Sequence, residues 1–248
     1  FADLTLYASR RVWGTRSRHI LVNASSYLLA NADSSSNDLA LLALGSELND
    51  FKNRWIRQAR LGVSRVNLGA SPYQQNFEIV LGAQYLMANK QRGEFRYQLQ
   101  LQDDLSRNNQ SVNGQIHSLR MGYRHHIGND QFRYFAEWEN NKRDLEYIDL
   151  AGNTRNFAPQ RYRLRGEYQH MFANSWQSLS RWDFRLSSDQ VPAGREDNRS
   201  VFLLRFLRPF KKDYEMGFEY EYFNQDSNDA QFSFTRNKIS LLLSWQKI

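Results

Sequence analysis

The chain offers few side chains suited to acid–base or metal chemistry. It has no cysteine, and its five histidines are at positions 19, 117, 125, 126 and 170. Metal ligation requires His, Asp or Glu side chains that converge at fixed spacing, and no such cluster is present. The sequence therefore predicts no metal site and no cofactor, and His125 and His126 are interpreted as polar residues at a turn.

Nucleophilic catalysis has one candidate pair, His117 and Ser118. Barrel lipases of outer membranes carry a serine and a histidine together on the membrane-facing side. In a strand, however, successive side chains point to opposite faces, so these two cannot pair directly. We therefore expect no enzyme activity. The acidic segment at Asp226, Asn228 and Asp229 does not have the spacing of a calcium loop and is interpreted as a solvated loop.

The net charge is +7, which would favour binding to nucleic acid, to an acidic polysaccharide or to lipopolysaccharide phosphates. The arginines are spread over many segments and form no continuous patch, so the sequence predicts no nucleic-acid binding.

These side chains are carried by segments with a period of two. Residues 95–102 read FRYQLQLQ, and residues 214–222 read YEMGFEYEY. Strict alternation over eight or more residues indicates a strand with one apolar and one polar face. No run approaches the ~18 to 20 apolar residues of a membrane-spanning helix, and the mean hydropathy is −0.73, yet 14% of the chain is aromatic.

Roughly 13 segments show this alternation, each as long as the ~9 to 11 tilted residues that cross a bilayer. Their expected spans are 2–12, 18–30, 38–49, 54–68, 75–88, 93–104, 115–126, 130–142, 160–172, 175–188, 199–209, 213–225 and 231–246.

The expected connections alternate in length. Short turns are expected at 14–17, 50–53, 89–92, 127–130, 173–175 and 209–213. Long polar loops are expected at 32–37, 69–76, 103–114, 143–159, 189–199 and 226–230. This pattern is typical of outer-membrane barrels with periplasmic turns and extracellular loops.

The fold expected is all-β, a membrane-spanning antiparallel up-and-down barrel in a bacterial outer membrane, with the whole of 1–248 as one domain. Such barrels usually have an even strand number. We therefore expect about 14 strands (12–16) and a fragment of a longer chain that begins before Phe1. A soluble β-sandwich with buried aromatics is the alternative.

Period two also assigns side chains to the interior. The predicted pore-lining residues are Arg60, Arg96, Arg120, Arg124, Arg133, Glu137, Arg163, Arg165, Glu167, Arg181, Asp183, Arg185, Arg205, Glu215, Glu219, Glu221, Arg236 and Lys238. The predicted aromatic girdle consists of Trp55, Tyr85, Trp138, Trp176, Trp182, Tyr222 and Trp245.

The expected interior has opposed basic and acidic walls, which would create a transverse field. The alternative is an Arg–Glu lattice that fills and stiffens the barrel through bidentate pairing. About 14 strands leave a water-filled interior unless it is plugged, and a plug would come from a loop such as 143–159 or from another chain.

Two C-terminal features resemble known proteins. The run 238–245 (KISLLLSW) resembles the C-terminal signal of outer-membrane insertion, although three residues follow it. The segments 219–222 (EYEY), 226–229 (DSND) and 234–239 (FTRNKI) resemble the closing hairpin of barrels that follow tetratricopeptide-repeat scaffolds in Gram-negative export proteins. These include exopolysaccharide exporters of the Pel, cellulose and poly-N-acetylglucosamine types and surface lipoprotein assembly modulators.

The resemblance covers about 25 residues and implies a channel that exports a large product, with a periplasmic repeat domain as partner. The lipid bilayer, lipopolysaccharide and the barrel insertion machinery are the other expected partners. We expect export of a polymer, above all an exopolysaccharide. Passive uptake of acidic oligosaccharides, export of a protein or lipoprotein, and a structural barrel with no open path are the alternatives.

Overall fold

The computed structural model describes residues 2–30, 38–69, 71–88, 90–105, 113–143, 147–148, 154–155, 158–188, 194–211 and 214–245. Its long strands are β1 (Ala2–Gly14), β2 (Arg18–Ala30), β3 (Leu39–Lys52), β4 (Trp55–Leu68), β5 (Ser71–Leu86), β6 (Arg92–Asp104), β7 (Gly114–Ile127), β8 (Asp130–Arg143), β11 (Gln160–Met171), β12 (Gln177–Ser188), β13 (Glu196–Lys211), β14 (Tyr214–Ser227) and β15 (Phe234–Trp245). A short hairpin, β9 (Tyr147–Ile148) and β10 (Thr154–Arg155), follows β8, and a 3₁₀ turn (Ala230–Phe232) precedes β15.

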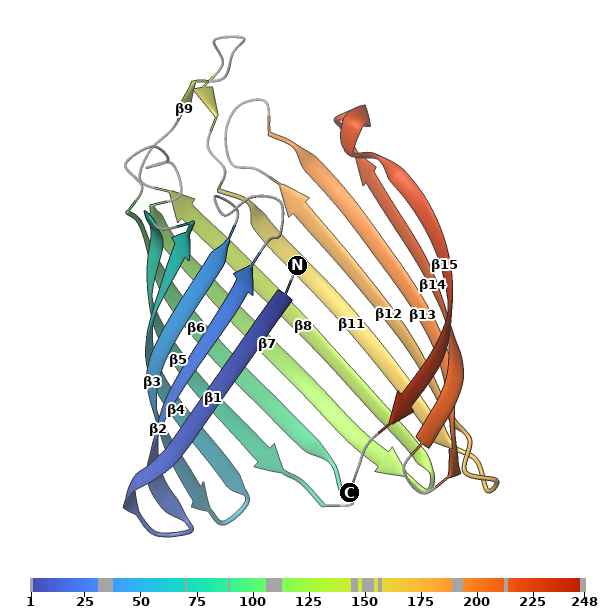
Figure 1. The fold of residues 1–248 in the computed structure, drawn as a ribbon. Coiled ribbons are helices and arrows are strands. Elements are labelled where there is room, and N and C mark those ends of the chain that lie inside the picture. The colour runs from blue at the N-terminus through green and yellow to red at the C-terminus, as the bar shows by residue number, and fades with distance from the viewer. Residues whose placement is uncertain are drawn as a thin grey trace.

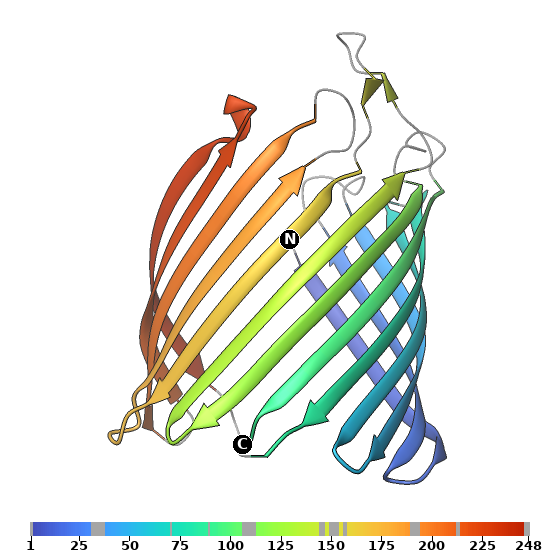
Figure 2. The same ribbon diagram turned by 180° about the vertical axis from the view of Figure 1, so that it is seen from behind.

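The long strands form a single 13-stranded sheet in which each pairs with the next along the chain, and β8 pairs with β11. Every pairing is antiparallel, as in the ladder of β7 with β8 and that of β11 with β12. The sheet curls into a barrel-shaped wall of tilted strands (Figures 1 and 2). The prediction of an all-β up-and-down fold is therefore confirmed.

The two ends of the wall differ, as the connection lengths predict. Short turns join strands at one end, where Asn53 (φ 57°) and Gly128 (φ 58°) adopt the left-handed conformation that tight turns require. One expected loop is wrong: β5 begins at Ser71 rather than near residue 76, so the connection after β4 is also short. Pro72 pairs opposite Asn67 at a register shift, a position that a residue without an N–H can occupy.

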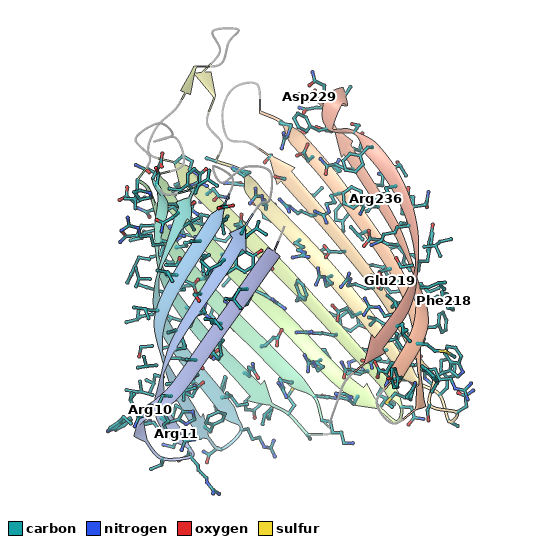
Figure 3. The ribbon with its side chains drawn as sticks, viewed as in Figure 1. Arg10, Arg11, Phe218, Glu219, Asp229 and Arg236 are labelled. Atoms are coloured by element: carbon teal, nitrogen blue, oxygen red, sulfur yellow. The ribbon has the colours of Figure 1, made fainter. Side chains whose placement is uncertain are left out.

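The outer face of the wall is apolar. Large side chains project from the middle of the strands, including Leu164 (59% exposed) and Trp182 (57% exposed). In Figure 3, Phe218 points away from the wall and its neighbour Glu219 points to the interior. A continuous apolar surface of this kind is unfavourable in water but suits hydrocarbon. The soluble-sandwich alternative would instead have packed these side chains against a second sheet.

The sheet has two ends, β1 and β15. Among the described residues, β1 pairs with β2 alone and β15 with β14 alone. The outward side chains of β15 are accordingly very exposed, with Ile239 at 78% and Leu241 at 89%. The part of the chain that is described also contains no helix long and apolar enough to cross a membrane.

Candidate functional site

The interior face of the wall is built by register. Residues that pair across antiparallel strands share a face of the sheet, so the pairings define rows that run from strand to strand. One row crosses β6, β7, β8, β11, β12 and β13, and it consists of Arg96, Arg120, Glu137, Arg163, Arg185 and Arg199. We call this set the arginine row. It contains five guanidinium groups and one carboxylate.

The arginine row runs obliquely from the short-turn end of the wall toward the long-loop end. Arg96 lies in the half of β6 nearer the short turns, whereas Arg199 lies close to the start of β13, at the long-loop end. The strands are tilted (Figure 1), so a row perpendicular to them rises as it passes from one strand to the next. Its cationic groups therefore extend diagonally from the short-turn half to the long-loop end.

Asp183 is the best-paired carboxylate on this face. It accepts hydrogen bonds from Arg163 Nε at 2.8 Å and from Arg165 Nε at 2.7 Å. Its side chain is 11% exposed. A carboxylate that binds two guanidinium groups in this way fixes their planes, because each fork of donors has one favourable orientation. Asp183 therefore orders the centre of the basic wall.

Further ion pairs join neighbouring strands along the interior. They are Arg60–Glu78, Arg120–Glu94, Arg133–Glu167, Arg161–Glu139, Arg205–Glu219 and Arg236–Glu221. These pairs support the expected Arg–Glu lattice in part. They do not support opposed basic and acidic walls, because Glu219 and Glu221 on β14 are matched by arginines of the adjacent strands β13 and β15. Which charges pair is determined by the residues that lie opposite each other on adjacent strands, and the period of two in the sequence does not specify those residues.

Seven interior arginines lack an ion-pair partner within 4.0 Å among the described residues: Arg11, Arg92, Arg96, Arg124, Arg181, Arg185 and Arg199. Register also places Arg124 directly opposite both Arg92 and Arg133. Like charges directly opposite each other are destabilising, and the Nε atoms of Arg124 and Arg181 are buried without a hydrogen-bond partner. An excess of unmatched positive charge therefore remains on this wall.

Two interior aromatics were missed by the sequence analysis. Phe135 is 6% exposed, and the Cζ of Arg120 lies 4.0 Å from its ring centroid. Phe223 lies under Arg199 at 4.7 Å. Both alternate with charged interior residues, so period two was the signal that could have found them. The same signal would have added Arg92, Arg161 and Arg199.

All the predicted pore-lining residues lie in strands whose pairings put them on the interior face, including Glu215 and Lys238 on β14 and β15. Apart from Trp245, the predicted girdle residues are on the outer face or at a turn, but at different heights. Trp55 and Tyr85 lie side by side at the short-turn end, with ring centroids 4.8 Å apart and ring planes tilted by 48°, and Trp176 follows a short turn there. Trp182 instead lies midway along β12.

Trp138 and Tyr222 lie further toward the long-loop end on the outer face, and the side chain of Trp245 is outside the described residues. A second group of aromatics surrounds the turn between β7 and β8. There Asp130 accepts hydrogen bonds from Tyr168 and from His170, each at 2.7 Å, and His125 stacks on Phe132 at 4.8 Å.

The described residues can be checked for a metal site and for the candidate pair His117 and Ser118. No group of three or more His, Cys, Asp or Glu side chains that could hold a metal is found within the described ranges. His117 points outward and bonds the Tyr97 hydroxyl at 2.9 Å, whereas Ser118 lies in register with Glu139 on the interior. The side chains of these two residues are thus on opposite faces, as predicted.

The chain was compared with protein families, curated proteins and solved structures. No family model matches the chain, and no curated protein matches it. A porin structure is similar. It is a NanC porin with 13% sequence identity, and the match covers 86% of this chain and 96% of that chain with a TM-score of 0.42.

Proposed function

We propose that this protein forms the wall of a channel through the outer membrane of a Gram-negative bacterium, and that the channel carries an anionic polysaccharide from the periplasm to the cell surface. The first part of the proposal is supported by the two faces of the sheet. An apolar outer face and a charged inner face on tilted strands of 12 to 16 residues match the requirements of a β-structure that spans a bilayer.

The arginine row carries the second part of the proposal. Its guanidinium groups stand along a diagonal from the short-turn half of the wall to the long-loop end, and three of them, those of Arg96, Arg185 and Arg199, have no ion-pair partner among the described residues. An anion moving along this row exchanges one cationic partner for the next. A sequence of sites that each bind weakly permits conduction, whereas one tight site would hold the solute.

The direction of transport rests on the resemblance of the C-terminal hairpin to barrels of polysaccharide exporters. Passive uptake of acidic oligosaccharides is the second candidate, because the same row of arginines would serve an inward flux equally well. For export of a protein or lipoprotein, we identify no supporting feature among the described residues of the interior face. Deleting the gene separates the first two: loss of surface polysaccharide supports export, and loss of growth on acidic oligosaccharides supports uptake.

Ion selectivity tests the channel itself. The full-length protein in a planar bilayer with a KCl gradient is expected to conduct and to prefer chloride over potassium. Replacing Arg124, Arg185 and Arg199 with glutamine should shift the reversal potential toward zero, because these arginines are three of the unmatched charges of the interior.

A matched control replaces Arg10, Arg18 and Arg57, which face outward near the short turns, with glutamine. This variant loses the same total charge and should keep the selectivity of the wild-type protein. Absence of conductance, even after the long loops are shortened, would contradict the channel. A cation preference would contradict the anionic cargo.

A further inference from the structure

A polar hollow lies in the interior wall at the end of the arginine row that is nearer the short turns. Its volume is about 260 Å³, and Gly82 of β5 is among its lining residues. The neighbours of Gly82 in the row are Gln58 on β4 and Arg96 on β6. Because Gly82 has no side chain, the wall is recessed there. A Cβ at this position would meet Gln58 at 3.6 Å, an ordinary contact, so a larger residue would fill the recess without breaking the strand.

The lining of the hollow combines two kinds of group. Arg96, Arg120 and Arg133 supply three positive charges against the single carboxylate of Glu94. Glu94 lies 3.8 Å from Arg120. The Nε atoms of Arg120 and Arg133 are buried and have no hydrogen-bond partner. The four charged groups of the lining thus have a net charge of about +2, and Arg133 also pairs with Glu167 outside the lining at 3.9 Å.

The other polar groups are amides. Gln58 and Gln84 line the same hollow, and Gln84 Oε1 accepts a hydrogen bond from Arg92 Nη1 at 3.1 Å. Amide side chains both donate to and accept from hydroxyl groups, and a carboxylate accepts from them, whereas guanidinium groups bind carboxylates through paired hydrogen bonds. The lining thus has partners for sugar hydroxyls and, next to them, partners for a carboxylate.

We propose that this hollow is a binding site for one carboxylate-bearing sugar unit, a hexuronate, of the transported polysaccharide. The inference rests on the proposed function and narrows its cargo to a uronate-containing polymer. The carboxylate lies between Arg96, Arg120 and Arg133, and the ring hydroxyls face Gln58, Gln84 and Glu94. The volume is slightly below the ~300 Å³ at which pockets for larger ligands begin, so it admits one ring and leaves the rest of the chain in the lumen.

Calorimetry on the detergent-solubilised full-length protein tests the site without requiring an open channel. The probes are digalacturonate, its methyl ester and glucose 6-phosphate. Digalacturonate should bind. The ester has the same rings without the charge and should bind at least about tenfold more weakly, because the charge-assisted hydrogen bonds are lost. Equal binding of glucose 6-phosphate and digalacturonate would show a general anion site and overturn the assignment to uronates.

Two substitutions test the location of the site. Gly82→Val fills the recess, and Arg96→Gln removes a guanidinium; each should weaken binding of digalacturonate about tenfold. The control for the first is Gly62→Val, since Gly62 also faces the interior and its Cβ would meet its nearest neighbour at the same 3.6 Å. The control for the second is Arg10→Gln, which removes an outward-facing arginine that belongs neither to the arginine row nor to the hollow.

The control variants should bind digalacturonate as the wild-type protein does. If Gly82→Val and Gly62→Val bind equally well, the site is not at this hollow. A wild-type protein that is anion-selective in bilayers but binds no digalacturonate would overturn the uronate site and leave the channel standing. A protein that binds digalacturonate but never conducts would overturn the channel alone.

Discussion

At the scale of residues, the interior is organised by arginines of two kinds. Some, such as Arg163 and Arg165, are held by Asp183, and they make the wall rigid. Others, such as Arg185, lie opposite further arginines and have no ion-pair partner within 4.0 Å among the described residues. A carboxylate that is taken away leaves buried charge without a partner, whereas an unmatched arginine that is taken away removes repulsion. The two kinds should therefore respond to substitution in opposite ways.

Asp183→Asn should lower the free energy of unfolding by about 2 kcal/mol, a value reduced from that of a fully buried pair because water reaches the arginines. Arg185→Gln is the matched control on the same strand and should leave stability unchanged or slightly higher. Urea unfolding in detergent micelles, followed by tryptophan fluorescence, measures both. Equal destabilisation by the two variants would mean that the distinction between paired and unmatched arginines is wrong.

At the scale of elements, each strand separates two media. β11 alternates exposed apolar residues such as Tyr162 and Leu164 with the interior arginines Arg163 and Arg165, and a change of face needs a shift of only one residue. The loss of folding stability caused by a new charged side chain therefore depends on the face of the strand that carries it. Gly166 is the exception on the outer face, where a Cβ would meet the rings of Tyr134 and Trp182 at 3.7 Å.

Leu164→Lys should destabilise the protein by about 2 to 4 kcal/mol, the cost of a cationic side chain toward the middle of the bilayer. Ser118→Lys is the matched control, because Ser118 faces the interior opposite Glu139, and it should cost about 1 kcal/mol or less. Reversible folding into lipid vesicles gives both values. Similar costs for the two variants would show that the outer face is not in contact with hydrocarbon.

At the scale of the whole molecule, the number of strands limits how the two edges of the wall can join. A meander of 13 strands ends with both edge strands running in the same direction, from the long-loop end to the short-turn end (Figure 1). Direct pairing of β1 with β15 would be parallel. An even-numbered barrel, which is the usual bacterial solution, needs one more strand between them that runs the opposite way.

Cysteine pairs distinguish the two closures in the full-length protein in membranes. A strand between β1 and β15 separates them by about 10 Å, which exceeds the reach of a disulfide. Cysteines at Leu4 or Leu6 combined with cysteines at Ile239, Leu241 or Leu243 should therefore remain reduced. Leu6 with Ser26 is the positive control, since these residues pair across β1 and β2. Rapid oxidation of a β1–β15 pair would establish a 13-stranded barrel.

The sequence by itself determined which side chains share a face, because the pleat of a strand is local and has a period of two. For that reason the antiparallel wall and its Arg-rich interior could be predicted, and Phe135 could have been. Only the tertiary structure decided which charges are neighbours. Arg163 lies between Glu137 and Arg185, and Gly82 opens a recess between Gln58 and Arg96, because register is fixed between strands and no segment specifies it alone.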